Sequence, residues 1–330
     1  MTGLTLTRRL FCAAAAAAFA LPALAADVTL RVGWTTSDGP QDPYAITARA
    51  LAAALEAEAP GVFALEFFPN RQLGDEKEML EGLGFGTLDL AIITNAVIAN
   101  VEPAFQLNDL PFLYGSAEQA HAVLDGEIGQ ELLGRLSAHG VVGLGFAEGG
   151  FRNMINNTRP VTAPEDVGGV KYRVMQNPVF IEMFGSLGGN AVPMSWGEVY
   201  TAVQQGTIDG LEIPVAVVDS GNFAEVVRYL SLTRHTYSAL GVLMSERAHA
   251  RLSADQRAAL HRAAARAIAE QRAEVAANDA AIIARLQERG MQVNEIDDPA
   301  AFRAMVGGVY EMFRGGIGAD LMDRALAAVN

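Results

Sequence analysis

Hydrophobic and polar positions follow two different periods along this chain, and segments of the two kinds alternate. Apolar side chains at every second position, or short continuous apolar runs, predict strands, whereas spacings of three and four predict amphipathic helices. The strand pattern occurs at residues 28–32, 63–68, 88–93, 143–147 and 170–174, and the helix pattern at residues 43–58 and 75–83. This alternation predicts the α/β class.

The strand expected at residues 170–174 has apolar side chains on one face and two basic side chains on the other. It must end before Pro178, because proline fixes φ and has no backbone donor. Arg173 therefore lies near the carboxyl end of a strand, which is the edge where ligands bind in open α/β sheets. A guanidinium there favours an anionic ligand. The residues alone leave open the alternative that Arg173 pairs with a structural acid of the protein.

The next helix signal begins at Ser195, which together with Glu198 has the sequence of a capping box. We expect a helix over residues 196–205, ended by Gly206, since glycine favours the left-handed conformation just past a helix end. Trp196 then lies in the first turn, where free N–H groups and the helix dipole also favour anions.

The longest uninterrupted helix signal covers residues 254–289. Ser253 and Gln256 have the sequence of a capping box, Gly290 follows the far end, and the interior contains no proline or glycine. At about 1.5 Å per residue such a helix is roughly 50 Å long, which exceeds the width of one small domain. It is therefore expected to brace two lobes. Two shorter helices with a bend at residues 276–279 are the alternative that the sequence leaves open.

Residues 1–25 have the features of an export signal, which is removed from the mature protein. Arg8 and Arg9 supply the charged region, an alanine-rich apolar run follows, and Ala-Leu-Ala at residues 23–25 suits the cleavage position. The run is too short and too rich in alanine for a good membrane span. The arginine pair is compatible with both the general secretory and the twin-arginine route. In either case we expect a periplasmic protein.

Export would leave residues 26–330, which is enough for two modest domains. The only cysteine, Cys12, lies in the signal ahead of its apolar run, so we expect no lipid anchor, disulfide or catalytic thiolate in the mature protein. The mature chain has 22 basic and 38 acidic residues, a net charge of −16, which argues against nucleic acid as a partner. In such a field, an arginine that binds an anion must be a local exception.

The sequence lacks the usual patterns of catalysis. There is no G-x-S-x-G and no H-E-x-x-H, and the five histidines do not have the spacing of metal ligands. The glycines at residues 143–149 match a dinucleotide-binding loop poorly, because the third glycine is misplaced and no helix signal follows. We therefore expect a protein that is not an enzyme and that uses neither a metal nor a cofactor.

Several motifs occur in the order and spacing of one known family. Near the centre are the K-x-R-V strand at residues 171–174, the S-x-x-E-V-Y-x-A-x-Q-x-G helix at 195–206 and the I-D-G-x-E turn at 208–212. The flanking motifs are QLGDEKEML at 72–80, GTLDLA at 86–91, LPFLY at 110–114, GFRNMINNTRPV at 150–161 and LSADQRAAL at 252–260. Together they span nearly the whole mature chain. It therefore resembles the substrate-binding proteins of tripartite ATP-independent periplasmic (TRAP) transporters, the dicarboxylate-binding-protein-like family, also called bacterial solute-binding protein family 7.

The resemblance implies a two-lobed, periplasmic-binding-protein-like (Venus flytrap) α/β fold with the ligand cleft between the lobes and a long helix that braces both. Lobe I should hold residues 26–148 and 239–278, and lobe II residues 149–238 and 279–330.

The same resemblance assigns binding roles. The planar fork of Arg173 is expected to bind the ligand carboxylate with two nitrogens. Arg152 corresponds to a second cleft arginine, and because two arginines would over-neutralise one carboxylate, we expect it to pair partly with Glu212 or with an acid at residues 75–76. Trp196 is expected to pack over the carbon skeleton of the ligand. Further cleft positions of the family correspond to Thr35, Asp75, Thr94, Asn95 and His235, of which Thr94 and Asn95 could hydrogen-bond hydroxyl groups.

One position departs from the family pattern. Many members place an asparagine directly after the D-G-x-E turn, where its amide helps to hold the carboxylate, whereas this chain has Ile213. The missing donor argues against a C4-dicarboxylate or a sialic-acid-like ligand, and it favours a ligand with an apolar portion near this point.

The function that the resemblance implies is capture of a small organic acid anion in the periplasm. The protein, expected to be a monomer, would deliver this anion to the small and large membrane subunits of a TRAP transporter driven by an ion gradient. Two alternatives stay open. One is a ligand-sensing subunit of a signalling system, and the less favoured one is an enzyme that acts on an anionic substrate.

Overall fold

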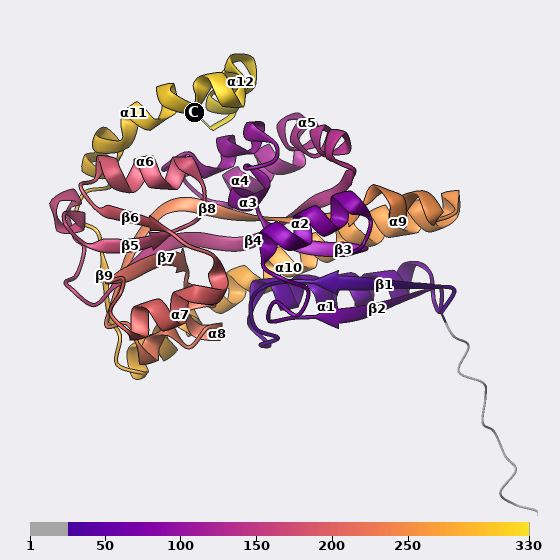
Figure 1. Ribbon diagram of the computed structural model, residues 1–330, viewed down its shortest axis with the longest axis horizontal. Helices are drawn as coiled ribbons and strands as arrows, with labels where there is room; N and C mark the ends of the chain where they lie inside the picture. Colours follow the sequence, from indigo (N-terminus) through magenta and orange to yellow (C-terminus); the bar gives the residue numbers. More distant parts are fainter. Residues whose placement is uncertain (1–25, 330) are drawn as a thin grey trace, which may run out of the picture.

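The structure is a computed structural model that describes residues 26–329. The predicted export signal, residues 1–25, lies outside the described residues, and so does Cys12 within it. Strands occupy the middle of the molecule and helices cover them on both sides (Figure 1).

One mixed sheet of nine strands forms the centre of the fold, in the order β2-β1-β3-β8-β4-β7-β5-β6, and β9 pairs with one end of β8. The strands are β1 (Val28–Gly33), β2 (Phe63–Phe68), β3 (Leu90–Thr94), β4 (Val141–Asn156), β5 (Lys171–Val174), β6 (Asn190–Pro193), β7 (Gly210–Pro214), β8 (Tyr229–Ser245) and β9 (Gln292–Glu295).

Helices pack on both faces of this sheet through two separate apolar clusters. One face carries α2 (Glu76–Phe85), α3 (Asn95–Ile98), α4 (Ala117–Asp125), α5 (Glu127–Arg135), α6 (Pro178–Ser186), α11 (Pro299–Ile317) and α12 (Ala319–Val329). The other carries α1 (Pro43–Glu58), α7 (Trp196–Gln204), α8 (Val215–Ser220), α9 (Glu246–Arg251) and α10 (Ala254–Glu288). Short 3₁₀ turns lie at Pro103–Asp109, Leu136–His139, Pro164–Val167 and Phe223–Glu225. None of the helices within residues 26–329 is long and apolar enough to cross a membrane.

Two long antiparallel strands, β4 and β8, pass through both halves of the molecule (Figure 1). β3 pairs with residues 240–244 of β8, whereas β7 pairs with residues 152–156 of β4. Strands β1 to β3 therefore belong to one half of the sheet and β5 to β7 to the other. Each half with its helices forms one lobe, so the two-lobed α/β fold is confirmed.

Helix α10 connects the two lobes from outside the sheet. It is unbroken over 35 residues, so it is about 50 Å long at 1.5 Å per residue, and the bent alternative is excluded. In the middle of the helix, the side-chain amide of Gln271 donates to the carbonyls of Glu148 (2.7 Å) and Pro43 (3.3 Å). Near its end, Arg285 pairs with Asp219 of α8 at 2.7 Å. The predicted brace is therefore present.

The sequence patterns locate β1, β2, β3 and β5 within a few residues. β4 extends well beyond residues 143–147, and no strand is predicted at β6, β7, β8 or β9. Both long strands bury polar side chains, among them Glu148, Arg152 and Ser238, where they pass between the lobes. These residues interrupt the apolar alternation on which the strand prediction depends.

The lobe boundaries remain a prediction. The C-terminal helix α12, which that prediction places in lobe II, lies beside α4 and α5, which it places in lobe I. The side-chain amide of Gln119 donates to the carbonyl of Val329 at 2.7 Å, and Arg324 pairs with Glu131.

The capping box predicted at Ser195 is not formed. Ser195 is the N-cap residue of α7, but its side chain makes no hydrogen bond to the helix backbone. Its hydroxyl donates to the Glu198 carboxylate at 2.8 Å, and the Glu198 N–H donates to the backbone carbonyl of Ser195 at 3.3 Å and not to the side chain. The box at Ser253 is complete: its Oγ accepts from the Gln256 N–H at 3.1 Å, and Gln256 Oε1 accepts from the Ser253 N–H at 2.9 Å.

This contrast between two serine caps is testable by urea unfolding. Ser253→Ala removes a bond to the backbone of α10, and we expect it to lower the free energy of unfolding by about 1 kcal/mol, the usual contribution of an N-cap. Ser195→Ala is the matched control, and we expect a smaller loss because its hydroxyl bonds no backbone group. Equal losses in the two variants would contradict the assigned caps.

Candidate functional site

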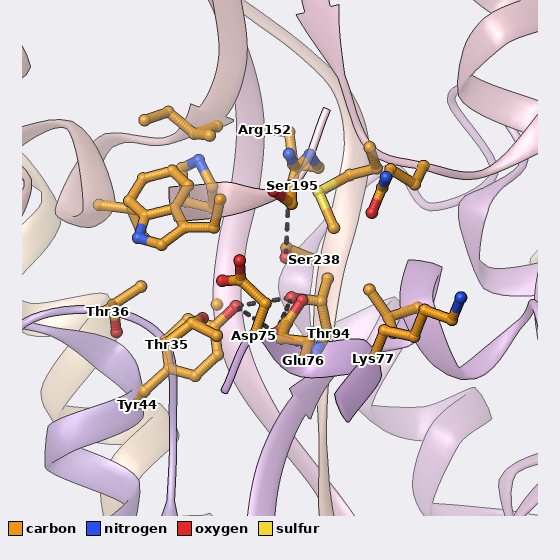
Figure 2. A pocket seen from close by; sticks show the side chains of 18 of the residues that line it. Thr35, Thr36, Tyr44, Asp75, Glu76, Lys77, Thr94, Arg152, Ser195 and Ser238 are labelled. Atoms are coloured by element: carbon orange, nitrogen blue, oxygen red, sulfur yellow. Dashed lines mark hydrogen bonds between the residues drawn. The ribbon is translucent and has the colours of Figure 1, made fainter. Parts of the chain in front are cut away.

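A cavity of about 320 Å³ lies where the two lobes meet, beside the middle of β4 and β8 (Figure 2). This volume is in the range of small-molecule sites. One side is formed by the segment after β1, the start of α1, the first turn of α2 and the end of β3. The opposite side is formed by the end of β5, the start of α7 and the junction of β7 with α8. The predicted site residues in its wall are Thr35, Asp75, Thr94, Arg152, Arg173, Trp196 and Ile213.

Three predicted site residues lie behind this wall. Glu212 and His235 are fully buried, 3.3 Å apart between carboxylate and imidazole. The amide nitrogen of Asn95 donates to the carbonyl of Phe105 at 2.8 Å, and its oxygen accepts from Asn108 at 3.0 Å. The structure therefore does not bring these three side chains into the cavity wall, and their contacts are to other protein groups.

Arg173 is a buried cation that faces the cavity without a protein anion. Only 2 % of its surface is exposed. Its Nε donates to the carbonyl of Met194 at 2.9 Å, and Nη1 lies 3.4 Å from the sulfur of Met175. Among residues 26–329, no carboxylate forms an ion pair with its guanidinium. Burial lowers the pKa of Arg173 to about 10, so the group still carries its positive charge at neutral pH.

Arg152, on β4, has its own counter-ion. Its guanidinium pairs through Nε and Nη2 with the carboxylate of Glu212 on β7, and both groups are almost fully buried. Burial acts to raise the pKa of Glu212, but Arg152 and the hydrogen bond with His235 more than offset it, and the pKa is lowered. Burial also lowers the pKa of His235, which keeps its imidazole neutral. The expected pairing of Arg152 with Glu212 is thus confirmed. Arg173 has no carboxylate of its own within ion-pair distance among the described residues, although Glu212 and Glu76 partly oppose the lowering of its pKa from farther away.

The wall opposite Arg173 is rich in oxygen. Thr94, at the end of β3, donates to Glu76 Oε1 through both its N–H (2.8 Å) and its hydroxyl (2.7 Å). The hydroxyl of Tyr44 lies 2.6 Å from that of Thr94. Asp75 precedes Glu76 at the start of α2, and its Oδ1 is buried without a hydrogen-bond partner among the described residues. Figure 2 shows these side chains together below the cavity.

Sequence reasoning did not assign Tyr44, Glu76 or Ser238 to the site, although all three line the cavity. Tyr44 belongs to the apolar pattern of α1, so nothing local distinguishes it from a core residue. Ser238 lies on the unpredicted strand β8. Glu76 had a usable signal, since it is part of the QLGDEKEML motif.

The N-terminus of α7 is not free for an anionic ligand, contrary to the sequence-based interpretation. The carboxylate of Asp75 lies close to the backbone N–H of Gly197, in the first turn of α7. Burial raises the pKa of Asp75, and Arg71 and this N–H partly oppose the rise. The ring of Trp196 lines the cavity and packs against Phe223 with a centroid distance of 5.6 Å.

Comparison with known proteins gives the same family throughout. The family model described as bacterial extracellular solute-binding protein, family 7, matches residues 35–315. A solute-binding protein of Verminephrobacter eiseniae is 37% identical over 304 residues, 92% of this chain and 90% of the relative. The 2,3-diketo-L-gulonate-binding periplasmic protein of Escherichia coli is 36% identical over 309 residues, 93% of both chains.

Solved structures agree with these relatives. A TRAP periplasmic solute-binding protein from Polaromonas sp. JS666, bound to D-erythronate, has a TM-score of 0.87 at 36% identity and covers 91% of this chain and 98% of its own. The sugar acid binding protein of Advenella mimigardefordensis, in complex with galactonate, has a TM-score of 0.88 at 31% identity and covers 92% and 98%.

Glu212→Gln tests the buried ion pair. The variant leaves Arg152 buried without its counter-ion, and breaking such a pair typically lowers the free energy of unfolding by about 3–5 kcal/mol. Glu295→Gln is the control, because the pair of Glu295 with Arg234 is exposed and we expect it to contribute at most about 1 kcal/mol. Since the pKa of Glu212 is lowered on folding, its contribution is present near neutral pH and is lost as the pH falls through that pKa. Urea unfolding at two pH values measures both effects, and similar losses for the two variants at neutral pH would contradict this account.

Proposed function

The chain belongs to the bacterial extracellular solute-binding protein family 7 and is a solute-binding protein, and we propose that it binds a small organic acid whose carboxylate pairs with Arg173. The observation that carries this proposal is the buried guanidinium of Arg173 at the cavity wall, which forms no ion pair with a carboxylate of the described residues. A buried charge is strongly unfavourable unless it is paired, and the cavity is where a paired anion could lie.

The known ligands of relatives support the proposed class. The Polaromonas and Advenella proteins hold D-erythronate and galactonate, and the Escherichia coli relative is named for 2,3-diketo-L-gulonate. Each of these ligands carries one carboxylate. In this chain the carboxylate would bind between the two Nη groups of Arg173, with Trp196 and Ile213 beside the carbon skeleton.

We propose further that the protein acts in the periplasm and passes its ligand to the small and large membrane subunits of a TRAP transporter. The support is the family, together with the similar protein from Polaromonas, which is a TRAP periplasmic solute-binding protein. A thermal-shift screen of sugar acids, dicarboxylates, 2-oxo acids and aromatic acids identifies the ligand.

Arg173→Ala should abolish binding of the acid selected by that screen. The carboxylate would then be buried without its partner, which typically costs about 2–5 kcal/mol of binding free energy. Arg173→Lys should also bind poorly, because an ammonium cannot supply two parallel hydrogen bonds. Lys171→Ala, on the exposed side of the same strand, is the matched control and should leave binding unchanged. Calorimetry measures the affinity of each variant for the acid, and a loss of affinity below tenfold in Arg173→Ala would contradict the proposal.

Ile213→Asn tests the apolar part of the site. Ile213 is 2 % exposed and lines the cavity, so an amide there would meet ligand carbon and lack a partner. We expect the selected acid to bind about 1–3 kcal/mol more weakly, the usual effect of an unsatisfied buried polar group, and more hydroxylated acids to gain. Ile213→Val keeps the surface apolar and serves as the control. If Ile213→Asn leaves the affinity for every acid unchanged, its side chain does not contact the ligand.

A further inference from the structure

We infer that the oxygen-rich wall formed by Tyr44, Asp75, Glu76 and Thr94 selects hydroxylated acids with a single carboxylate and rejects their dicarboxylate counterparts. This inference rests on the proposed function, since it concerns the part of the cavity that faces the rest of a ligand held by Arg173.

The hydroxyl protons of Tyr44 and Thr94 are both directed within this wall. The Thr94 hydroxyl donates to Glu76 Oε1, so its own oxygen is free to accept. The Tyr44 hydroxyl, 2.6 Å away, then donates to Thr94. Both protons are used within the wall. Neither hydroxyl has a donor left for an acceptor in the cavity.

The carboxylate oxygens of the wall have free acceptor positions. Glu76 Oε1 accepts from the N–H and the hydroxyl of Thr94, the Tyr44 hydroxyl lies 3.4 Å from it, and within residues 26–329 no donor is found for Oε2. Asp75 Oδ1 is buried without a partner, and Oδ2 lies 3.9 Å from Arg71. Both residues line the cavity. The wall therefore presents acceptors, and buried acceptors require donors.

Charge distinguishes a ligand hydroxyl group from a second carboxylate at this wall. Arg152 is paired with Glu212, and Arg173 has no carboxylate within ion-pair distance among the described residues, so the first carboxylate of a ligand pairs with Arg173. Asp75 and Glu76 lie near enough to Arg173 to feel its charge, yet burial raises the pKa of both acids. A second ligand carboxylate would add a further negative charge beside these acids in a site partly removed from water, where like charges repel strongly. Ligand hydroxyl groups in the same place would donate to the free oxygens.

Lys77 is the remaining basic residue of the cavity lining and must be considered as a partner for a second carboxylate. It is exposed, and its side chain extends away from Asp75 and Glu76 in Figure 2. Exposed charges are screened by water and salt, so Lys77 does not remove the repulsion at the buried wall.

The test compares acids that differ at one carbon. Galactonate and galactarate differ only in a terminal hydroxymethyl group against a carboxylate, and erythronate and meso-tartrate form the corresponding four-carbon pair. Calorimetry on the full mature chain should show the hydroxymethyl acid binding at least tenfold more tightly than the diacid in at least one pair. Equal affinities, or a preference for the diacid, would overturn the inference.

Glu76→Gln isolates the residue responsible. The amide keeps an oxygen for Thr94 and places an N–H₂ donor at the position of Oε2, so the diacid should gain at least fivefold relative to the hydroxymethyl acid. Glu81→Gln, on an exposed turn of α2, makes the same charge change and should leave the ratio unaltered. A Lys77→Met variant should also retain the wild-type ratio. If Glu76→Gln leaves the affinity ratio of the hydroxymethyl acid to the diacid unchanged, the wall does not select between the two acids.

The outcomes separate this inference from the proposed function. If the protein binds dicarboxylates through Arg173 and not sugar acids, the function stands and the selection by the wall is wrong. The same holds if it binds only acids without hydroxyl groups. If no organic acid of any class binds, the proposed function itself fails.

Discussion

The site is organised around one unfavourable feature, a guanidinium that is buried without a carboxylate. Removing Arg173 from water is costly, and the carbonyl of Met194 recovers only part of its hydration. The neighbouring charge is arranged differently, because Arg152 and Glu212 neutralise each other and burial keeps His235 uncharged. Arg173 therefore makes one point of an otherwise strongly acidic chain favourable for binding an anion.

Local sequence patterns predict part of the anion site, whereas the rest of the cavity depends on contacts between residues far apart in the sequence. Arg173 follows from a strand end and Trp196 from a helix start, each readable within a few residues. Ile213, on strand β7, was predicted only from its place in the family motif. Tyr44 could not be assigned in this way, because its hydroxyl becomes part of the site by bonding to Thr94, which is 50 positions away in the sequence. Ser238 lies on β8, a strand that the sequence pattern does not predict because buried polar residues interrupt its apolar alternation.

The helices also divide into features that the sequence predicts correctly and features that it does not. The continuous α10 is predictable because its composition and its cap at Ser253 agree over the whole length. The cap at Ser195 has the same sequence pattern, yet its hydroxyl bonds the side chain of Glu198 and not the helix backbone. The Glu198 N–H donates to the backbone carbonyl of Ser195, so the same sequence pattern gives a side-chain cap at one helix and none at the other.

Hydrogen bonds join the two lobes beside the cavity. Asn177 donates to the carbonyl of Ala96 at 3.0 Å and to Asp109 at 2.9 Å, and Ser220 donates to Asp42 at 2.7 Å. Each bond of this kind contributes only about 0.5–1.5 kcal/mol net, because its groups bond to water when it is absent. The two acids are also unfavourably buried: desolvation raises the pKa of Asp42 to about 6 and that of Asp109 to about 7. An anion held by Arg173 between the lobes would add a charge-assisted contact to these bonds, and a ligand favours the arrangement to which it binds more tightly.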